Sequence, residues 1–381
     1  MKAILKLISS MLIGCLLGVI IVIPLISLIN GESIQSVAHD LFVDRGLSIL
    51  SIVGTTIIAA LVAFILQIII HEGGHLVAGL LTGYKFVSFR FLNWTLIRKD
   101  GRLQWRKFEL AGTGGQCLLA PPSGPIEEID TRWYNAGGVL ANAITALIAI
   151  MPVWVFDLPS WLDIFLIMMA ITGVFIALTN GIPMKMGGVA NDGSNLFQLE
   201  KDMDGKLCFC NVLEMNACNQ EGVPYSEMPR RLFFIPKPTD WKNAMHVAAV
   251  LTSATRKQSQ HQWEDSYELL TVARCYKGEM MVLYQMELEN MLTLACLATG
   301  RDEEARQHYT DDVAKYVARH AATQSDKQLT TMAVALVLDR DRDRAEQILQ
   351  KLETERDKYI HQGDVAMSLD LMRWFLDKRQ T

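Results

Sequence analysis

Two histidines and a glutamate lie within five residues of one another, in the sequence His71-Glu72-Gly73-Gly74-His75. On an α-helix, positions 71 and 75 are one turn apart on the same face, so their imidazoles can bind one zinc ion. A zinc ion in a hydrolase keeps three protein ligands and a water, and a nearby carboxylate can take a proton from that water. We therefore predict His71 and His75 as metal ligands and Glu72 as a general base.

The motif lies in an unusually apolar stretch of the chain. Residues 47–70, "LSILSIVGTTIIAALVAFILQIII", precede it without a charge, and "LVAGLL" follows it. An ionisable residue in the middle of a membrane costs roughly 2.5–3.5 kcal/mol on insertion scales, and metal coordination would compensate that cost. The alternative is a histidine pair satisfied by hydrogen bonds alone. Gly73 and Gly74 allow either close helix packing or the close approach of a substrate chain.

A third ligand is required, and Asp192 is the candidate. It lies in "LTNGIPMKMGGVANDGSNLF", at the end of a later apolar segment, and a carboxylate is a good zinc ligand. Taken alone, Asn191-Asp192-Gly193 is also a typical turn sequence.

Four apolar segments are predicted to span a membrane: residues 7–29, a span within 47–81, 135–152 and 161–179. Between the first two, only Arg45 is strongly basic, whereas the loop after the second carries eight basic residues: Lys85, Arg90, Arg98, Lys99, Arg102, Arg106, Lys107 and Arg132. Basic loops stay on the cytoplasmic side. The N-terminus, this loop and everything after the fourth span are therefore predicted to be cytoplasmic, which also puts Asp192 on the side where the second span ends.

The loop between the second and third spans has β-strand composition in 87–91 and 95–108, with a hairpin-turn signal at Asp100-Gly101. We expect a small β-hairpin at the membrane surface; a plain basic loop on lipid head groups is the alternative. The Gly- and Pro-rich residues 111–125 are expected to form a re-entrant or gating segment.

Beyond residue 193 the apolar spans stop. We expect one or two helices in 195–218, a proline-rich linker in 222–240, and amphipathic helices from 241 onward. Residues 291–309 and 331–349 resemble each other, with Ala305 and Ala345 in equivalent places, which suggests tetratricopeptide-type helical hairpins. A generic helical bundle is the alternative.

Composition agrees with a membrane part joined to a water-soluble part. Half of the 381 residues are hydrophobic and 20% are charged, and the net charge of −5 gives no support for a nucleic-acid partner. The seven cysteines suggest no disulfide framework, and Cys208, Cys210 and Cys218 are read as ordinary thiols. The predicted fold is a mainly α polytopic membrane protein divided into 1–45, a core at 46–195, a connecting segment at 196–240 and a cytosolic helical domain at 241–381.

Residues 50–195 resemble the site-2 protease family of intramembrane zinc metalloproteases. The resemblance lies in HEGGH on a membrane helix and in a second motif of that family, N-x-x-P-x-P-x-L-D-G, whose ends match Asn180, Pro183, Asp192 and Gly193. The interior differs, because the second Pro and the Leu are absent and four extra residues separate Asn180 from Asp192. The resemblance implies Asp192 as the third ligand of one zinc ion.

The intervening segment "NAGGVLANAI" is similar to a glycine-plus-asparagine signature of the same family, through Gly137, Gly138 and Asn142. Asn142 is a candidate hydrogen-bond donor to an oxyanion or to the substrate backbone; a helix–helix hydrogen bond is the alternative.

The expected function is hydrolysis of peptide bonds within or near transmembrane segments of membrane-protein or peptide-precursor substrates, at a cell membrane, and the resemblance implies a bacterial host. Extended substrate is expected to pair with an exposed strand edge, and a protein partner with the C-terminal helices. A catalytically silent zinc-binding scaffold is the main alternative, although it leaves Glu72 without a role. A metal transporter is less favoured, because a single ionisable cluster makes a poor transport path.

Overall fold

The computed structural model describes residues 20, 23–24, 26–28, 31–39, 49–99, 102–108, 114–186 and 189–378. The chain divides into two compact units, Met1–Ala78 with Asn135–Ile182 and Gly79–Tyr134 with Pro183–Thr381. The predicted core at 46–195 is therefore shared between both units. Most of the predicted first span, 7–29, lies outside the described residues.

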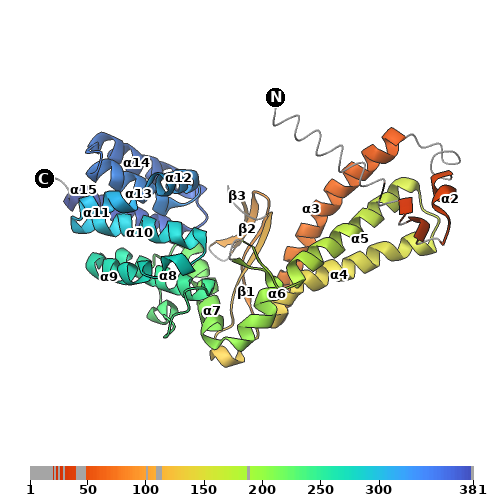
Figure 1. Ribbon diagram of the computed structural model, residues 1–381, viewed down its shortest axis with the longest axis horizontal. Coiled ribbons are helices and arrows are strands. Elements are labelled where there is room, and N and C mark those ends of the chain that lie inside the picture. Colours follow the sequence, from red (N-terminus) through yellow and green to blue (C-terminus); the bar gives the residue numbers. More distant parts are fainter. Residues whose placement is uncertain are drawn as a thin grey trace. The chain divides into compact units, whose positions relative to one another are not determined.

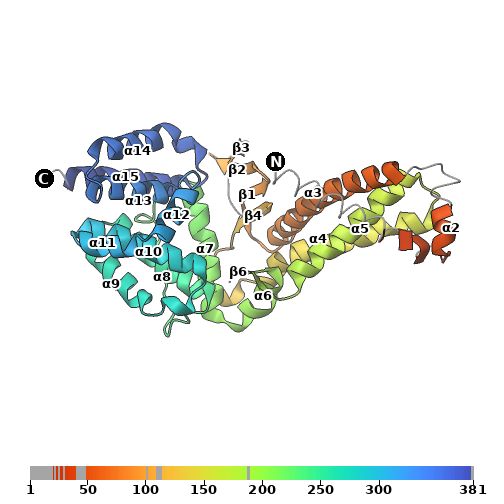
Figure 2. The ribbon, with the colours of Figure 1, turned by 45° about the horizontal axis from the view of Figure 1, so that its top comes forward.

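The first unit is built on three long helices, α3 (Ile49–Leu81), α4 (Arg132–Val155) and α5 (Ser160–Gly181), with a short helix α2 (Ile34–His39). In the described part of the chain, Ser51–Leu81, Ile126–Val155 and Ser160–Gly181 are long and apolar enough to cross a membrane. They coincide with the second, third and fourth predicted spans. Figures 1 and 2 both show α4 and α5 running side by side, joined by the short connection that the sequence predicts.

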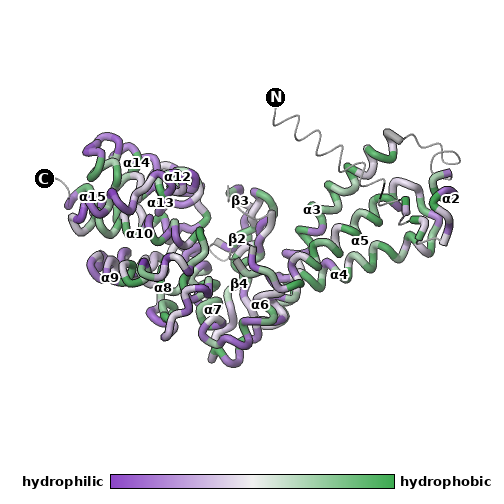
Figure 3. The backbone as a smooth tube through the Cα atoms, viewed as in Figure 1, coloured by the Kyte–Doolittle hydropathy of each residue, from purple (hydrophilic) through white to green (hydrophobic). Residues whose placement is uncertain are grey.

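This bundle exposes large apolar side chains and buries a few strongly polar ones beside an apolar core that includes Ala63 and Ile167. Large side chains such as Leu61, Leu147 and Phe175 are more than half exposed, and the tubes of α3, α4 and α5 are hydrophobic along most of their length (Figure 3). Gln67 and Asn142 are fully buried. A helix bundle in water has the opposite pattern, so this arrangement fits a lipid environment.

The second unit contains a four-stranded antiparallel sheet with the order β3-β2-β1-β4. Its strands are β1 (Lys85–Phe91), β2 (Trp94–Lys99), β3 (Arg102–Lys107) and β4 (Gly115–Ala120). The predicted hairpin is present as β2 and β3, which pair from Trp94↔Lys107 to Lys99↔Arg102. The sheet is larger than the predicted hairpin, because β1 pairs with β2 on one side and β4 pairs with β1 on the other. Residues 115–120, expected in a re-entrant or gating segment, instead form this strand, which pairs with β1 and has three consecutive buried side chains, Cys117, Leu118 and Leu119.

Two small strands, β5 (Lys185–Met186) and β6 (Val189–Ala190), precede the helices α6 (Asp192–Gln198) and α7 (Met203–Gln220), which confirms the two helices expected near 195–218. The buried Lys206 ammonium donates to the Glu200 carboxylate at 2.9 Å. Glu200 also accepts from the backbone N–H and the hydroxyl of Thr131. These bonds fix the start of α7 to the segment that precedes α4.

The predicted linker, 222–240, carries only a short 3-10 helix, η4 (Arg230–Phe233). The helices that follow are α8 (Ala244–Ser259), α9 (Trp263–Arg274), α10 (Val282–Thr299), α11 (Asp302–His308), α12 (Asp311–His320), α13 (Ser325–Val337), α14 (Arg342–Glu355) and α15 (Gln362–Lys378). Short 3-10 turns complete the unit: η2 (Ile126–Glu128), η3 (Leu199–Lys201), η5 (Lys277–Glu279) and η6 (Arg356–Lys358).

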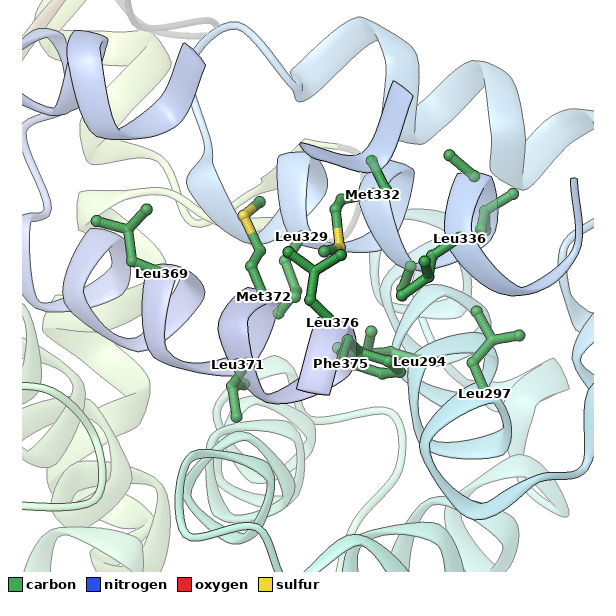
Figure 4. Close-up of a cluster of buried hydrophobic side chains, with 14 of the residues drawn as sticks. Leu294, Leu297, Leu329, Met332, Leu336, Leu369, Leu371, Met372, Phe375 and Leu376 are labelled. Atoms are coloured by element: carbon green, nitrogen blue, oxygen red, sulfur yellow. The ribbon is translucent and has the colours of Figure 1, made fainter. Parts of the chain in front are cut away.

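The two similar sequence segments form two helical hairpins, α10–α11 and α13–α14. Ala305 and Ala345 occupy equivalent places on the second helix of each pair, and both are fully buried in one core. Figure 4 shows how this core closes, with Met372 and Phe375 of α15 pointing towards Leu329 and Met332 of α13. The small alanines let the second helices approach the first, as the repeat pattern requires.

One titratable contact joins α7 to the start of α15. The Asn219 side-chain amide donates to the Asp364 carboxyl at 2.6 Å and accepts from the Asp364 backbone N–H at 2.7 Å. Withdrawal of this carboxyl from water and the nearby Asp326 carboxylate raise the pKa of Asp364 to about 7. In an unfolded chain an aspartate has a pKa of about 3.9.

The folded state therefore holds the proton of Asp364 more tightly than the unfolded state. Stability from this group is present in acid and falls as the pH rises from about 4 to about 7. We expect Asp364→Asn, which keeps the hydrogen bond, to melt at the wild-type temperature near pH 4 and at a higher temperature at pH 8. Thermal unfolding of the detergent-solubilised chain at both pH values measures this. An equal difference between the two chains at pH 4 and pH 8 would contradict the assignment.

Candidate metal centre

His71 and His75 lie on the buried side of α3, and their Nε2 atoms face each other at 3.2 Å. The rings are almost perpendicular, with 4.7 Å between their centroids. Two imidazole nitrogens bound to one tetrahedral zinc at about 2.0–2.1 Å would lie about 3.3–3.4 Å apart. The observed separation fits that donor set, so the helical spacing predicted from the sequence gives two nitrogens that can share one ion.

The direction of the His71 ring is fixed by a chain of hydrogen bonds that crosses the bundle. The Gln67 side-chain amide donates to the Met169 carbonyl of α5 at 3.0 Å, which leaves its own carbonyl to accept from Asn142 of α4 at 2.6 Å. Asn142 also donates to the Gln67 backbone carbonyl at 2.9 Å. Its side-chain oxygen is therefore the atom that meets His71 Nδ1 at 2.7 Å.

That order of donors determines the tautomer of His71. Because Asn142 offers an oxygen, Nδ1 must carry the proton and donate. The lone pair of a neutral His71 is then on Nε2, the atom that faces His75. Metal-binding histidines commonly donate their second N–H to an acceptor in this way. Asn142 and Gln67 thus present His71 Nε2 as a ligand.

Glycines let α4 lie directly against the histidines. A Cβ atom on Gly138 would be 2.5 Å from His75 Nε2 and 2.7–2.8 Å from atoms of the His71 ring. A Cβ on Gly74 would lie 2.2 Å from the Gly137 carbonyl oxygen, and the reverse contact is equally close. In contrast, a Cβ on Gly73 meets nothing within 4 Å. Of the two motif glycines, Gly74 is therefore required for helix packing and Gly73 is not.

Glu72 follows His71 on α3 and is partly exposed, as a group that exchanges protons with water must be. Asp192 belongs to the second unit, where it is the first residue of α6. Its role as third ligand stays a prediction.

The local backbone at Asp192 explains the unusual spacing of its motif. Asn191 N–H donates to the Met184 carbonyl at 3.1 Å, and Met184 N–H donates to the Asn191 side chain at 3.0 Å. Between them, β5 and β6 pair as an antiparallel ladder. Asn191 also caps α6 by accepting from Ser194 N–H. The extra residues thus belong to a short β-hairpin, and the hydrogen bonds between Met184 and Asn191 hold its two ends together.

A second group of candidate ligands, Cys296, Glu304 and His308, lies among the helices of the second unit. His308 is buried and bonds to the Glu289 carboxylate at 2.5 Å, with Glu304 at 3.6 Å on its other nitrogen. Burial raises the pKa of the Cys296 thiol to about 12. A metal would need the thiolate, whereas the His308 ring already has a carboxylate next to each of its two nitrogens. We interpret this group as a buried ion-pair network.

Cys208 and Cys210 are buried, free cysteines, which fits the ordinary thiols that the sequence predicts. Burial raises the pKa of both Cys208 and Cys210 on α7 to about 12, so they are unreactive thiols. His246 is buried beside Asp240, whose backbone N–H donates to it at 3.1 Å. The sequence analysis missed Gln67, although a signal was present: it is the one strongly polar residue in 47–70, and it precedes His71 by one helical turn.

Comparison with known proteins gives no match: no family model, no curated protein and no solved structure is similar to the chain. The function must therefore be argued from the site itself.

The two glycine environments predict opposite effects of the same substitution. Gly138→Ala places a methyl group against both imidazoles, and we expect loss of at least tenfold in zinc affinity. Gly73→Ala adds a methyl group in open space and replaces a poor helix former, so zinc binding and stability should be retained. Zinc titration of both purified variants measures this. Equal affinities would show that α4 does not limit the space around the histidines.

The hydrogen-bond chain predicts that Gln67 controls metal affinity without touching the metal. Gln67→Leu removes the acceptor that orients Asn142, and we expect zinc affinity to fall about 10–100-fold. Thr56→Val is the matched control, because Thr56 is also a buried polar residue of α3 and its hydroxyl has no hydrogen-bond partner among the described residues. If Gln67→Leu and Thr56→Val bind zinc with the same affinity, the hydrogen-bond chain through Gln67 and Asn142 does not control metal affinity.

Proposed function

We propose that the protein is an intramembrane zinc metalloprotease of the site-2 protease type. The observation that carries the proposal is the pair of facing His71 and His75 nitrogens, oriented by Asn142 inside a bundle whose outer surface is apolar. The two Nε2 atoms face each other at the separation that two zinc-bound imidazole nitrogens have, which supports a shared ion.

His71, His75 and Asp192 would hold the metal, with the fourth position left for water. When bound, zinc supplies Lewis-acid polarisation of the scissile carbonyl and lowers the pKa of its water. Glu72 takes a proton from that water and passes one to the leaving amine. Hydrogen bonds already engage both ends of the Asn142 amide, which favours a positioning role over the oxyanion contact predicted from sequence.

The substrates we propose are peptide segments within or next to a membrane. The exposed apolar side chains of α3, α4 and α5 support a lipid environment for the site. A helical substrate hides its peptide bonds, so it must become extended locally before cleavage. Gly73 sits one residue from Glu72 and has open space beside it, which suits the approach of an extended chain. We also propose that the site lies towards the cytoplasmic side, because the loop after α3 is rich in basic residues.

Replacement of Glu72 separates the protease from a silent zinc scaffold. We expect Glu72→Gln to keep one zinc per chain and to lower cleavage of co-expressed single-span membrane proteins by at least about 100-fold, the usual contribution of a general base. Fragment yield on immunoblots and the zinc content of the purified chain measure the two effects. Unchanged cleavage in Glu72→Gln would exclude this mechanism.

Ligand variants complete the same experiment. His71→Ala and Asp192→Asn should lose both zinc and cleavage, because each removes one of three protein ligands. If Asp192→Asn keeps full zinc content and activity, the third ligand has been assigned wrongly, while the histidine pair and Glu72 would still stand.

A further inference from the structure

A groove of about 850 Å³ opens in the second unit, between the turn that joins β1 to β2 and the helices α13, α14 and η6. Its two walls belong to one compact body. Ile97 and Phe108 of the sheet region share a small buried core with Ile360, and the Gln220 side chain donates to the Val87 carbonyl at 3.0 Å. The groove is thus a feature of a fixed junction.

The charges on the groove are mostly positive. Lys107 of β3, Lys351 of α14 and Lys358 of η6 line it, and Glu355 is the one acidic residue among the described residues that line it. Lys358 bonds to Glu355 at 2.7 Å, and that hydrogen bond lowers the pKa of the Glu355 carboxyl. The pair is therefore neutral at pH 7, and Lys107 and Lys351 give the groove a net charge of about +2. Lys107 and Lys351 belong to different elements, so the positive charge is spread over both walls of the groove.

Apolar and aromatic side chains alternate with these cations. Trp94 and Leu92 are each 48% exposed at the rim, and Tyr359 forms part of the wall. The Lys107 ammonium lies 4.5 Å from the centre of the Trp94 ring. Leu92 has a φ of +49°, a backbone region that normally favours glycine or asparagine. Leu92 is the first residue of the two-residue turn between β1 and β2, and its backbone N–H donates to the Gly114 carbonyl, so the turn presents its side chain at the rim of the groove.

We propose that this groove binds an acidic segment of the polypeptide substrate, outside the part that is cleaved; this rests on the proposed protease function. Carboxylates of the segment pair with Lys107 and Lys351, while its apolar side chains pack on Leu92 and Trp94. A polypeptide fits better than a single phosphate group, because the cations are spread over separate elements with aromatic surface between them. The groove would thus select substrates by a feature remote from the zinc site.

The test uses the full chain in phosphatidylcholine nanodiscs, with Glu72→Gln as background so that nothing is cleaved. The probe is the fluorescein-labelled acidic peptide EDLEWEDLE, with its uncharged counterpart QNLQWQNLQ, measured by fluorescence anisotropy. We expect the acidic peptide to bind at least tenfold more tightly than the uncharged one. The double variant Lys107→Glu/Lys351→Glu should remove that preference. Lys315→Glu, a charge reversal at an exposed lysine of α12 outside the groove, should stay within twofold of the background.

Leu92→Gly tests the apolar contact without destabilising the fold, because glycine adopts positive φ without steric strain. We expect weaker binding of both peptides with no loss of thermal stability. The proposal is overturned if the acidic peptide does not bind, if the double variant and Lys315→Glu behave alike, or if added phosphatidylserine displaces the peptide completely, which would assign the groove to lipid head groups. Binding that persists while the Glu72 cleavage test fails would retain the groove and reject the protease.

Discussion

The site depends on one chain of hydrogen bonds, which begins at the Met169 carbonyl and ends at the His71 ring. In lipid there is no water to satisfy a misdirected amide, so each partner has only one favourable orientation. Gln67 can present its oxygen to Asn142 only because α5 occupies its nitrogen. Asn142 then has only its oxygen to offer to His71. Helices α3, α4 and α5 are thus joined by the same bonds that set the tautomer of a metal ligand.

The glycines of α3 and α4 allow the close helix approach that this chain of hydrogen bonds requires. Hydrogen bonds of 2.6–2.9 Å between Asn142 and Gln67 require α4 to lie very close to α3. Gly74 and Gly137 allow the two backbones to meet, and Gly138 leaves room for the imidazoles. Larger residues would separate the helices and break the polar bonds at the same time. The close packing of α3 against α4 and the hydrogen bonds between Asn142 and Gln67 therefore depend on the same glycines.

Some of this was predictable from local sequence, and some was not. The histidine pair follows from helical periodicity, and the three described spans follow from apolar runs, because both signals lie within one helix. Strand β4 was not predicted, since its pairing with β1 is non-local and its Gly- and Pro-rich flanks suggest irregular chain. The hairpin of β5 and β6, which contains the extra residues before Asp192, was not predicted either. It depends on the hydrogen bond between Met184 and Asn191, which the sequence does not reveal. The relay role of Asn142 needed Gln67, which lies 75 residues earlier in the sequence.

The electrostatics of the histidine pair argue for a cation at this point in the bundle. His71 Nε2 carries a lone pair once its other nitrogen donates to Asn142, and His75 Nε2 lies 3.2 Å away. Without an ion, a single N–H of His75 satisfies this contact within α3. A shared metal satisfies both lone pairs at the same separation and offers far more free energy. The polar chain across the three helices holds the His71 ring in the orientation that the proposed metal site requires.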